Sequence, residues 1–408
     1  MVLVEHLLSW SRAVSRSRRA FIAAKAKHLR TAAIAALVLA AIALIATYPA
    51  GAVLRHGASG VGAANQQTAP TTTGTNPGTT TLTLAEQVGQ LIIATYQGRT
   101  PPPSLLGAIQ LGHVGAVILM GDNTTGGIRA TKAATAKMQA AAGAGGNPGL
   151  LIMTDQEGGT VKRLVGPPNY AAIDMANAAT AYTQGQATGE LLKSVGVNVD
   201  LAPVADVIRA NGFIEHEGRS FGASPAVVSN AACKFAAGLA GVGVAYTLKH
   251  FPGLGDAIAT TDTQAVSVKE SASGLRADDA AYRRCGHGPL ALVMISSASY
   301  PHMTGSVPAV LDPKIYSQVL PQDGVTALPI SDSFESGAIN AVASEGPAKT
   351  AINAGVDMVM YSEYESVALS AYTKLLVDAR AGALNRARVQ AACDRVLQLK
   401  AQLGIGSS

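Results

Sequence analysis

Short apolar runs alternate with longer amphipathic stretches over most of this chain. Eight of the runs are rich in aliphatic and β-branched residues, as buried parallel strands are, and they cover residues 90–96, 116–120, 150–154, 197–201, 244–248, 291–296, 325–331 and 357–361. Helical patterns separate them, for example at 128–144, 181–195, 225–241, 269–284 and 346–355, and a last helix is expected over 385–403. Repeated alternation with about eight strands predicts an α/β fold, a (β/α)8 barrel of the TIM type.

A doubly wound sheet is the alternative architecture. Such a sheet normally carries a glycine-rich phosphate loop after an early strand. The candidate segment here, GDNTTGG at 121–127, matches neither the Walker A nor the GxGxxG pattern. We therefore favour the barrel, and a nucleotide-binding protein becomes the weakest of three functional hypotheses.

The first 81 residues differ in character from the rest. Residues 31–54 hold no charged side chain and are long enough to cross a bilayer, which needs about 20 apolar residues. The basic residues before them predict a cytoplasmic N-terminus, and the Gly, Thr, Pro and Asn of 55–81 predict a flexible linker. The expected organisation is a basic tail (1–30), a transmembrane anchor or signal (31–54), a linker (55–81) and a barrel domain (82–408).

A cleaved secretory signal is the alternative interpretation of residues 31–54. Ala50-Gly51-Ala52 resembles a small-residue cleavage site. We expect an uncleaved anchor, because the apolar run exceeds the usual core of a signal peptide. Both interpretations place the barrel domain outside the cytoplasm, either anchored to the membrane or secreted.

The formal charge of +5 raises the question of a nucleic-acid partner. Seven of the 31 Lys and Arg residues, but only one of the 26 Asp and Glu residues, lie in residues 1–30. The remainder therefore has 24 basic against 25 acidic residues and is close to neutral. We expect no nucleic-acid partner, and we expect a monomer.

Three cysteines occur, and none has the CxxC spacing typical of a metal site. Cys233 lies on one predicted helix and Cys285 ends the next, and neighbouring barrel helices can touch. In an oxidising compartment these two could form a disulfide. The alternative is that both, with Cys393, are buried thiols that act as small apolar residues.

Polar residues gather where the predicted strands end, which is the face where TIM barrels carry their active sites. Asp155 and Glu157 follow the third strand and Asp206 follows the fourth. Lys249 and His250 follow the fifth, and Asp332 follows the seventh. Carboxylates and cations that converge at one mouth suit a polyhydroxylated ligand or a transition state that develops charge.

Several motifs strengthen this interpretation. KHFPGLGD (249–256) resembles the KHFPGHGD signature of glycoside hydrolase family 3, in its β-N-acetylglucosaminidase-like branch. Five more segments resemble family motifs in the same order: TDQEGGTVKRL (154–164), NVDLAPVADV (198–207), GRSFGASP (218–225), LPISDSFESGAI (328–339) and AINAGVDMVM (351–360). The resemblance extends over about residues 84–403.

The resemblance implies a role for each matched residue. Asp332 matches the family's catalytic nucleophile, which forms a covalent glycosyl-enzyme. The residues expected to bind sugar hydroxyls are Asp155, Arg163, Arg219, Lys249 and His250. Asp206 is expected to support the site rather than react. An alternative for Asp332 is a structural aspartate that pairs with Lys249 or Arg219. The family implies no metal and no organic cofactor.

The sequence departs from the family at the general acid/base. The family branch carries an Asp-Ser-His dyad shortly after KHFPGHGD, but here Thr260 and Asp262 occupy the dyad positions in an ungapped alignment. If the alignment is shifted by two residues, Asp262 matches the Asp of the dyad, and Gln264 stands in place of its His. The second His of the signature is Leu254, and Ser297 stands where a further His is common. We assign Asp262 as the substitute acid/base, ahead of Asp256, Glu215 and Glu217.

The leading hypothesis is therefore a retaining exo-glycosidase for β-linked N-acetylglucosaminides of cell-wall fragments. The alternative from another class is a sugar-binding pseudo-enzyme that has lost turnover. A carboxylate within reach of the glycosidic oxygen, near residues 256–262, would favour the enzyme.

Overall fold

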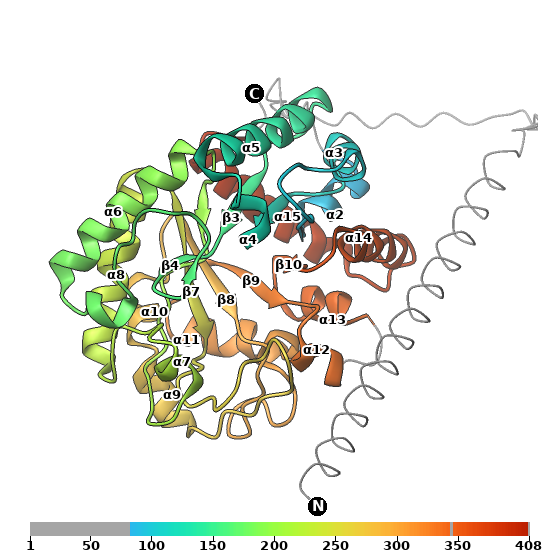
Figure 1. Ribbon diagram of the computed structural model, residues 1–408. Helices are drawn as coiled ribbons and strands as arrows, with labels where there is room; N and C mark the ends of the chain where they lie inside the picture. Colours follow the sequence, from blue (N-terminus) through green and yellow to red (C-terminus); the bar gives the residue numbers. More distant parts are fainter. Residues whose placement is uncertain (1–81, 343–345, 407–408) are drawn as a thin grey trace, which may run out of the picture. The chain divides into compact units, whose positions relative to one another are not determined.

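Eight parallel strands close into a barrel in the computed structural model, which describes residues 82–342 and 346–406 (Figure 1). The expected anchor and linker lie outside these residues. The barrel strands follow one another in chain order around the ring: β1 Ile92–Ala94, β2 Ala116–Leu119, β3 Leu151–Thr154, β6 Val199–Asp200, β7 Ala245–Phe251, β8 Ala291–Ile295, β9 Leu328–Ser333 and β10 Met358–Met360. All eight predicted runs are confirmed as strands. A short antiparallel hairpin, β4 Gln156–Gly158 and β5 Val161–Lys162, follows β3.

Helices surround the barrel, one or more after each strand (Figure 1). The longer ones are α3 Pro103–Gln110, α5 Gly127–Ala144, α6 Ala178–Ser194, α8 Pro225–Gly241, α13 Pro347–Ala354, α14 Glu365–Arg380 and α15 Arg386–Gln402. Shorter helical segments are α2 Leu84–Gln90, α4 Gly121–Thr124, α7 Phe213–His216, α9 Ala272–Asp278, α10 Ala280–Cys285, α11 Leu320–Gln322 and α12 Gly337–Val342. Thr83 caps α2 through a capping box with Glu86, because each side chain accepts the other's backbone N–H.

The helix expected over 269–284 is wrong in detail, since it forms two helices. The side chain of Ser271 accepts the N–H of Gly274 and starts α9 three residues later than expected. Asp279, with φ −67° and ψ 8°, then leaves the helical conformation and separates α9 from α10. The apolar periodicity continues across the break, so the pattern alone does not reveal it.

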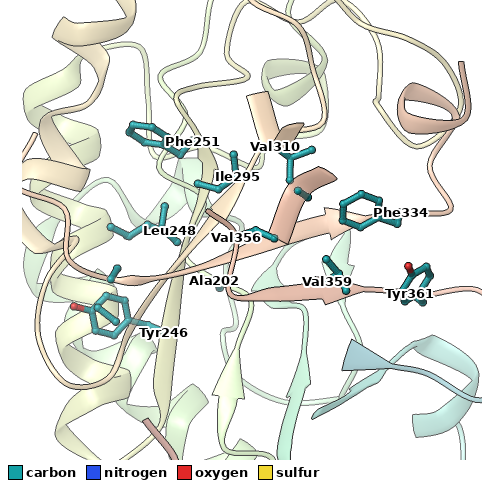
Figure 2. Packing of buried hydrophobic residues seen from close by; sticks show 14 of the residues in the cluster. Ala202, Tyr246, Leu248, Phe251, Ile295, Val310, Phe334, Val356, Val359 and Tyr361 are labelled. Atoms are coloured by element: carbon teal, nitrogen blue, oxygen red, sulfur yellow. The ribbon is translucent and has the colours of Figure 1, made fainter. Parts of the chain in front are cut away.

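Two apolar layers hold the barrel together. Alternate strand residues point inward, where Ala245, Met294 and Ile330 belong to one cluster. Their neighbours Tyr246 and Leu248 point outward and join the larger cluster between strands and helices (Figure 2). This strict alternation fixes which side chains reach the barrel mouth beyond the strand ends.

The predicted pairing of Cys233 with Cys285 is confirmed, and their Cα atoms are 5.7 Å apart. The bridge joins α8 to the end of α10. It encloses β7 and the loop that follows. Cys393 is a buried free thiol.

We predict that the double variant Cys233→Ser/Cys285→Ser is less stable than the parent. The bridge closes a loop with a sequence separation of 52, and the chain-entropy model gives about 4 kcal/mol for a loop of that length. Denaturant unfolding of both proteins measures the difference, and Cys393→Ala serves as a control that leaves the bridge intact. Equal unfolding free energies for parent and double variant would contradict the prediction.

Lys400 is a fully buried lysine on α15, and its Nζ donates to Gln90 Oε1 at 2.6 Å. It leads to a second prediction, on the pH dependence of stability. Burial lowers its pKa to about 7. An unfolded lysine keeps a pKa near 10.4, so between these values the unfolded state binds more protons and stability rises with pH. The slope from this group approaches about 1.4 kcal/mol per pH unit.

Lys400→Met should remove this contribution, so that the unfolding free energy of the variant changes less between pH 7 and 10 than that of the parent. Lys374→Met, at an exposed lysine on α14, is the matched control. Parallel pH profiles for the parent and Lys400→Met would show that Lys400 carries its charge in the folded protein.

Candidate active site

A cavity of about 500 Å³ opens at the carboxyl ends of the barrel strands. The seven residues to which the sequence assigns a catalytic or sugar-binding role all line it: Asp155, Arg163, Arg219, Lys249, His250, Asp262 and Asp332. They come from the ends of β3, β7 and β9 and from the loops that follow β5, α7 and β7. Residues far apart in the sequence thus meet at one site, on the face where TIM barrels bind substrates.

The inward alternation of the strands places the deepest of these side chains. Leu151 and Met153 point into the barrel, and Asp155 is the next residue of the same parity. By the same rule, Lys249 has the inward parity of Ala245 in β7, and Asp332 has that of Ile330 in β9. In β7 the pairing register with β8 shifts between Leu248 and Phe251. Such an irregularity re-aims side chains, and consecutive residues Lys249 and His250 both face the cavity.

A buried ion-pair network forms one wall of the cavity. Lys249 Nζ lies 2.8 Å from Asp155 Oδ1 and 2.7 Å from Glu157 Oε1, and its side chain is only 2% exposed. Arg219 approaches Glu157 with both prongs of its guanidinium, Nε to Oε2 at 2.9 Å and Nη2 to Oε1 at 2.8 Å. Arg163 Nη2 lies 3.2 Å from Asp155 Oδ2. The network therefore joins two carboxylates and three cations in a fixed arrangement.

Opposite charges keep this network ionised despite its burial. Burial alone raises the pKa of Asp155, but Lys249 and Arg163 outweigh it and hold the pKa at about 2. Burial of Glu157 is likewise outweighed by Lys249 and Arg219, so its pKa is lowered. Burial would lower the pKa of Lys249, yet the two carboxylates raise it. The wall thus presents charged donors and acceptors to a ligand across the neutral pH range.

The β4–β5 hairpin places Glu157 and Arg163 within this wall. Gly158 ends β4 and Gly159 begins the turn, with φ of 101° and 57°, values that favour glycine. The buried side chain of Gln156 fastens the hairpin to the following loop: its Oε1 accepts the N–H groups of Arg163 and Leu164 at 3.1 and 2.9 Å. Its Nε2 donates to the carbonyl of Leu164 at 2.9 Å.

Asp206 supports His250 from below the cavity. Its Oδ2 lies 2.8 Å from His250 Nδ1, and its Oδ1 accepts the backbone N–H groups of His250 and Leu254 at 3.1 and 2.7 Å. A carboxylate at Nδ1 favours the tautomer that carries its proton there. Nε2 is then the ring nitrogen available to a ligand.

Asp332 differs from the carboxylates of the wall. Its Oδ1 accepts the N–H of Ser333 at 2.7 Å, and among the described residues it takes part in no ion pair; Lys249 and Arg219 are paired elsewhere. The structural pairing considered for Asp332 is therefore absent from this part of the chain. Burial raises the pKa of Asp332, His250 opposes that rise, and the charge of Asp262 adds to it.

Asp262 stands on the loop between β7 and α9, where Thr260 and Thr261 line the cavity beside it. Of the other acid/base candidates, Glu217 also lines the cavity and lies 3.8 Å from Arg219 Nη1. Asp256 and Glu215 are not among the lining residues, and Glu215 instead accepts the N–H of Asn211. The structure thus reduces four candidates to two that face the cavity.

Two features of the cavity were missing from the predicted site. The first is the role of Glu157, which the sequence places at the mouth without a function: it is the carboxylate shared by Lys249 and Arg219, and its spacing of two from Asp155 is the signal that could have identified this role. The floor is apolar and consists of Ile118, Met120, Met294 and Met360. Strand parity could have found these residues, since all four have the inward register.

Neither a metal cluster nor a membrane-spanning helix is found in the described part of the chain. No three His, Cys, Asp or Glu residues within 82–342 and 346–406 are arranged to hold a metal ion. No helix in those ranges is both long and apolar enough to cross a bilayer.

Comparison with known proteins agrees with this geometry. Residues 83–399 match the model of the glycosyl hydrolase family 3 N-terminal domain. An uncharacterized secreted glycosyl hydrolase from Arthroderma benhamiae is 32% identical over 78% of this chain and 94% of its own length. A beta-hexosaminidase from Mycobacterium tuberculosis is 29% identical over 63% of this chain and 70% of its own.

Solved structures show the same relationship. A beta-N-acetylhexosaminidase from Beutenbergia cavernae is 31% identical, with a TM-score of 0.72 over 79% of this chain and all of its own. A family 3 beta-N-acetylglucosaminidase from a Paenibacillus species is 27% identical, with a TM-score of 0.73 over 80% of this chain and 63% of its own. A family model that matches most of the chain, together with a barrel and a charged cavity of this kind, leads to one conclusion. The chain belongs to glycosyl hydrolase family 3 and is a glycoside hydrolase.

Proposed function

We propose that this hydrolase is a retaining exo-glycosidase that removes terminal β-linked N-acetylglucosamine, with cell-wall fragments as its substrates. The observation that carries the proposal is Asp332, a partly buried carboxylate without an ion-pair partner in the described structure, which faces the same cavity as Asp262. A cavity of about 500 Å³ at the mouth of the barrel has room for a terminal sugar ring. The substrate class is suggested by the relatives, which are named beta-hexosaminidases and beta-N-acetylglucosaminidases.

The proposed binding mode uses the charged wall. Asp155, Arg163, Arg219, Lys249 and His250 hydrogen-bond the sugar hydroxyls, and the apolar floor supports the ring. Because the wall is already held by its own ion pairs, it loses little conformational freedom when the sugar binds. This pre-organisation fixes the anomeric carbon in front of Asp332.

The chemistry then proceeds in two steps. A carboxylate oxygen of Asp332 attacks the anomeric carbon while the bond to the aglycone oxygen breaks and that oxygen takes a proton from Asp262. A water molecule, deprotonated by Asp262, next attacks the anomeric carbon and releases the sugar and the Asp332 carboxylate. Burial and the charge of Asp262 raise the pKa of Asp332, which makes its carboxylate more basic than that of an ordinary aspartate.

The compartment is part of the proposal. The Cys233–Cys285 bridge suits an oxidising environment, and the relative from Arthroderma benhamiae is named as secreted. We place the barrel domain outside the cytoplasm, either released or attached through residues 31–54.

Asp332 should carry the covalent intermediate. Asp332→Asn keeps the size of the side chain but removes the nucleophile, so turnover should fall by more than about 10³-fold while the barrel stays folded. An activated fluorinated N-acetylglucosaminide, whose glycosyl-enzyme hydrolyses slowly, should label the parent on Asp332, as peptide mass spectrometry would reveal. A label on another residue, or near-parent activity of Asp332→Asn, would refute this assignment.

Asp262 should matter most for substrates with poor leaving groups. Asp262→Ala should lower kcat/KM for a disaccharide by about 10² to 10⁴, the usual value of general acid catalysis. Nitrophenolate leaves without a proton, so for nitrophenyl glycosides the formation of the glycosyl-enzyme should change little. Azide should restore the second step by attacking the glycosyl-enzyme. Glu217→Gln is the matched control at the other acid/base candidate that lines the cavity. If Asp262→Ala lowers kcat/KM equally for the disaccharide and the nitrophenyl glycoside, Asp262 has a structural role.

The pH profile tests the same residue independently. The negative charge of Asp262 raises the pKa of Asp332, so Asp262→Asn should lower that pKa. The acidic limb of kcat/KM for a nitrophenyl glycoside should then move to lower pH than in the parent. An unchanged acidic limb would mean that the charge of Asp262 does not affect the pKa of Asp332. Binding of a glycoside without any hydrolysis would favour the sugar-binding pseudo-enzyme.

A further inference from the structure

The loop that carries Asp262 is fastened to the segment that carries Asp332. The N–H of Gly337 donates to the carbonyl of Asp262 at 2.7 Å, and the N–H of Ala338 donates to the carbonyl of Thr261 at 3.0 Å. These donors are the first two residues of α12, whose own backbone leaves them without helical acceptors. The loop therefore satisfies two free N–H groups of the helix, and the helix fixes the loop.

Gly337 makes this close approach sterically feasible. A Cβ added there would lie 2.2 Å from the carbonyl carbon of Thr263, 2.3 Å from its oxygen and 2.5 Å from the nitrogen of Gln264. All three are backbone atoms, so no side-chain rotation can relieve the overlap. The φ of Gly337 is not in the left-handed region, so the requirement for glycine at this position comes from contact rather than from backbone conformation.

The contact joins the two segments that carry the carboxylates of the proposed reaction. Asp332 and Ser336 line the cavity from the Gly337 side, and Thr260, Thr261 and Asp262 line it from the other. Thr261 is only 4% exposed, so the loop is packed at this point although Asp262 itself is exposed. A shift of the loop relative to α12 would change the position of Asp262 relative to Asp332.

We propose that Gly337 is a positioning residue, which holds Asp262 at the distance from Asp332 that proton transfer to the leaving group requires. This inference rests on the proposed acid/base function of Asp262. Neither side chain nor charge is involved at Gly337, because it acts only through the packing of the loop against α12.

Gly337→Ala tests the role. The loop must retreat by about 1 Å, and a misplacement of that size can cost about 10²-fold in rate. We expect kcat/KM for a disaccharide to fall about 10- to 100-fold, while that of a nitrophenyl glycoside changes little. The acidic limb for the nitrophenyl glycoside should move to lower pH, as in Asp262→Asn, because Asp262 has moved away from Asp332.

Gly185→Ala is the matched control for steric strain. Its added Cβ would lie 2.2 Å from the carbonyl oxygen of Phe235, between α6 and α8 and outside the cavity lining. Gly185→Ala should lower the stability of the protein without changing the ratio of kcat/KM for the nitrophenyl glycoside to kcat/KM for the disaccharide. Ala338→Pro is a second variant in case Gly337→Ala folds poorly, since it removes one of the two hydrogen bonds and proline is tolerated in a first helical turn.

The double variant Asp262→Ala/Gly337→Ala completes the test. If Gly337 acts through Asp262, the preference for nitrophenyl glycosides should be no larger than in Asp262→Ala alone. An unchanged ratio and an unchanged acidic limb in Gly337→Ala and Ala338→Pro would overturn the inference, as would additive effects in the double variant. If the parent hydrolyses neither substrate, the proposed function is refuted. The same holds if Asp262→Ala does not selectively lose kcat/KM for the disaccharide.

Discussion

The ammonium group of Lys249 is the point on which the active site depends. It lies between Asp155 and Glu157 with almost no exposure to water, so none of the three charges is stable there alone. Removing one partner of such a buried group typically costs about 3–5 kcal/mol, because the other charge remains desolvated. The interaction also joins β7 to the hairpin that follows β3 across the barrel mouth, although β6 separates those strands in the sheet. Arg219 and Arg163 then attach their loops to the same two carboxylates.

This network also explains why Asp332 differs from its neighbours. Asp155 and Asp332 both stand at inward-facing positions at strand ends and both are partly buried, yet the pKa of Asp155 is lowered to about 2 and that of Asp332 is raised. Lys249 is already paired with Asp155 and Glu157, so it lowers the pKa of Asp332 by less than burial raises it. Two carboxylates of the same chemical type thus have their pKa values shifted in opposite directions by their surroundings, which is the basis for the different roles that we propose for them.

The sequence predicts most of the fold, because the signals for a barrel are local. Each buried strand is a short apolar run, and the parity within a run determines that Asp155, Lys249 and Asp332 face inward. Less follows from local pattern where contacts between distant segments decide the structure. The break at Asp279 interrupts a continuous apolar periodicity, and the role of Glu157 depends on Lys249 and Arg219, which only the folded barrel brings to it. The contact between Gly337 and the Asp262 loop likewise leaves no trace in either segment alone.

The methionine floor of the cavity has a consequence for selectivity. Methionine is unbranched and changes conformation at little cost, so Met120, Met294 and Met360 form a surface that adapts to the ring above it. The wall opposite is rigid, since each of its charges is held by another. In the binding mode that we propose, discrimination between epimeric sugars would therefore fall to the wall, whose hydrogen bonds have fixed directions, whereas the floor would accommodate bulkier or smaller substituents on the ring. Evolution could thus alter the accepted ring size through the three methionines and leave the catalytic geometry intact.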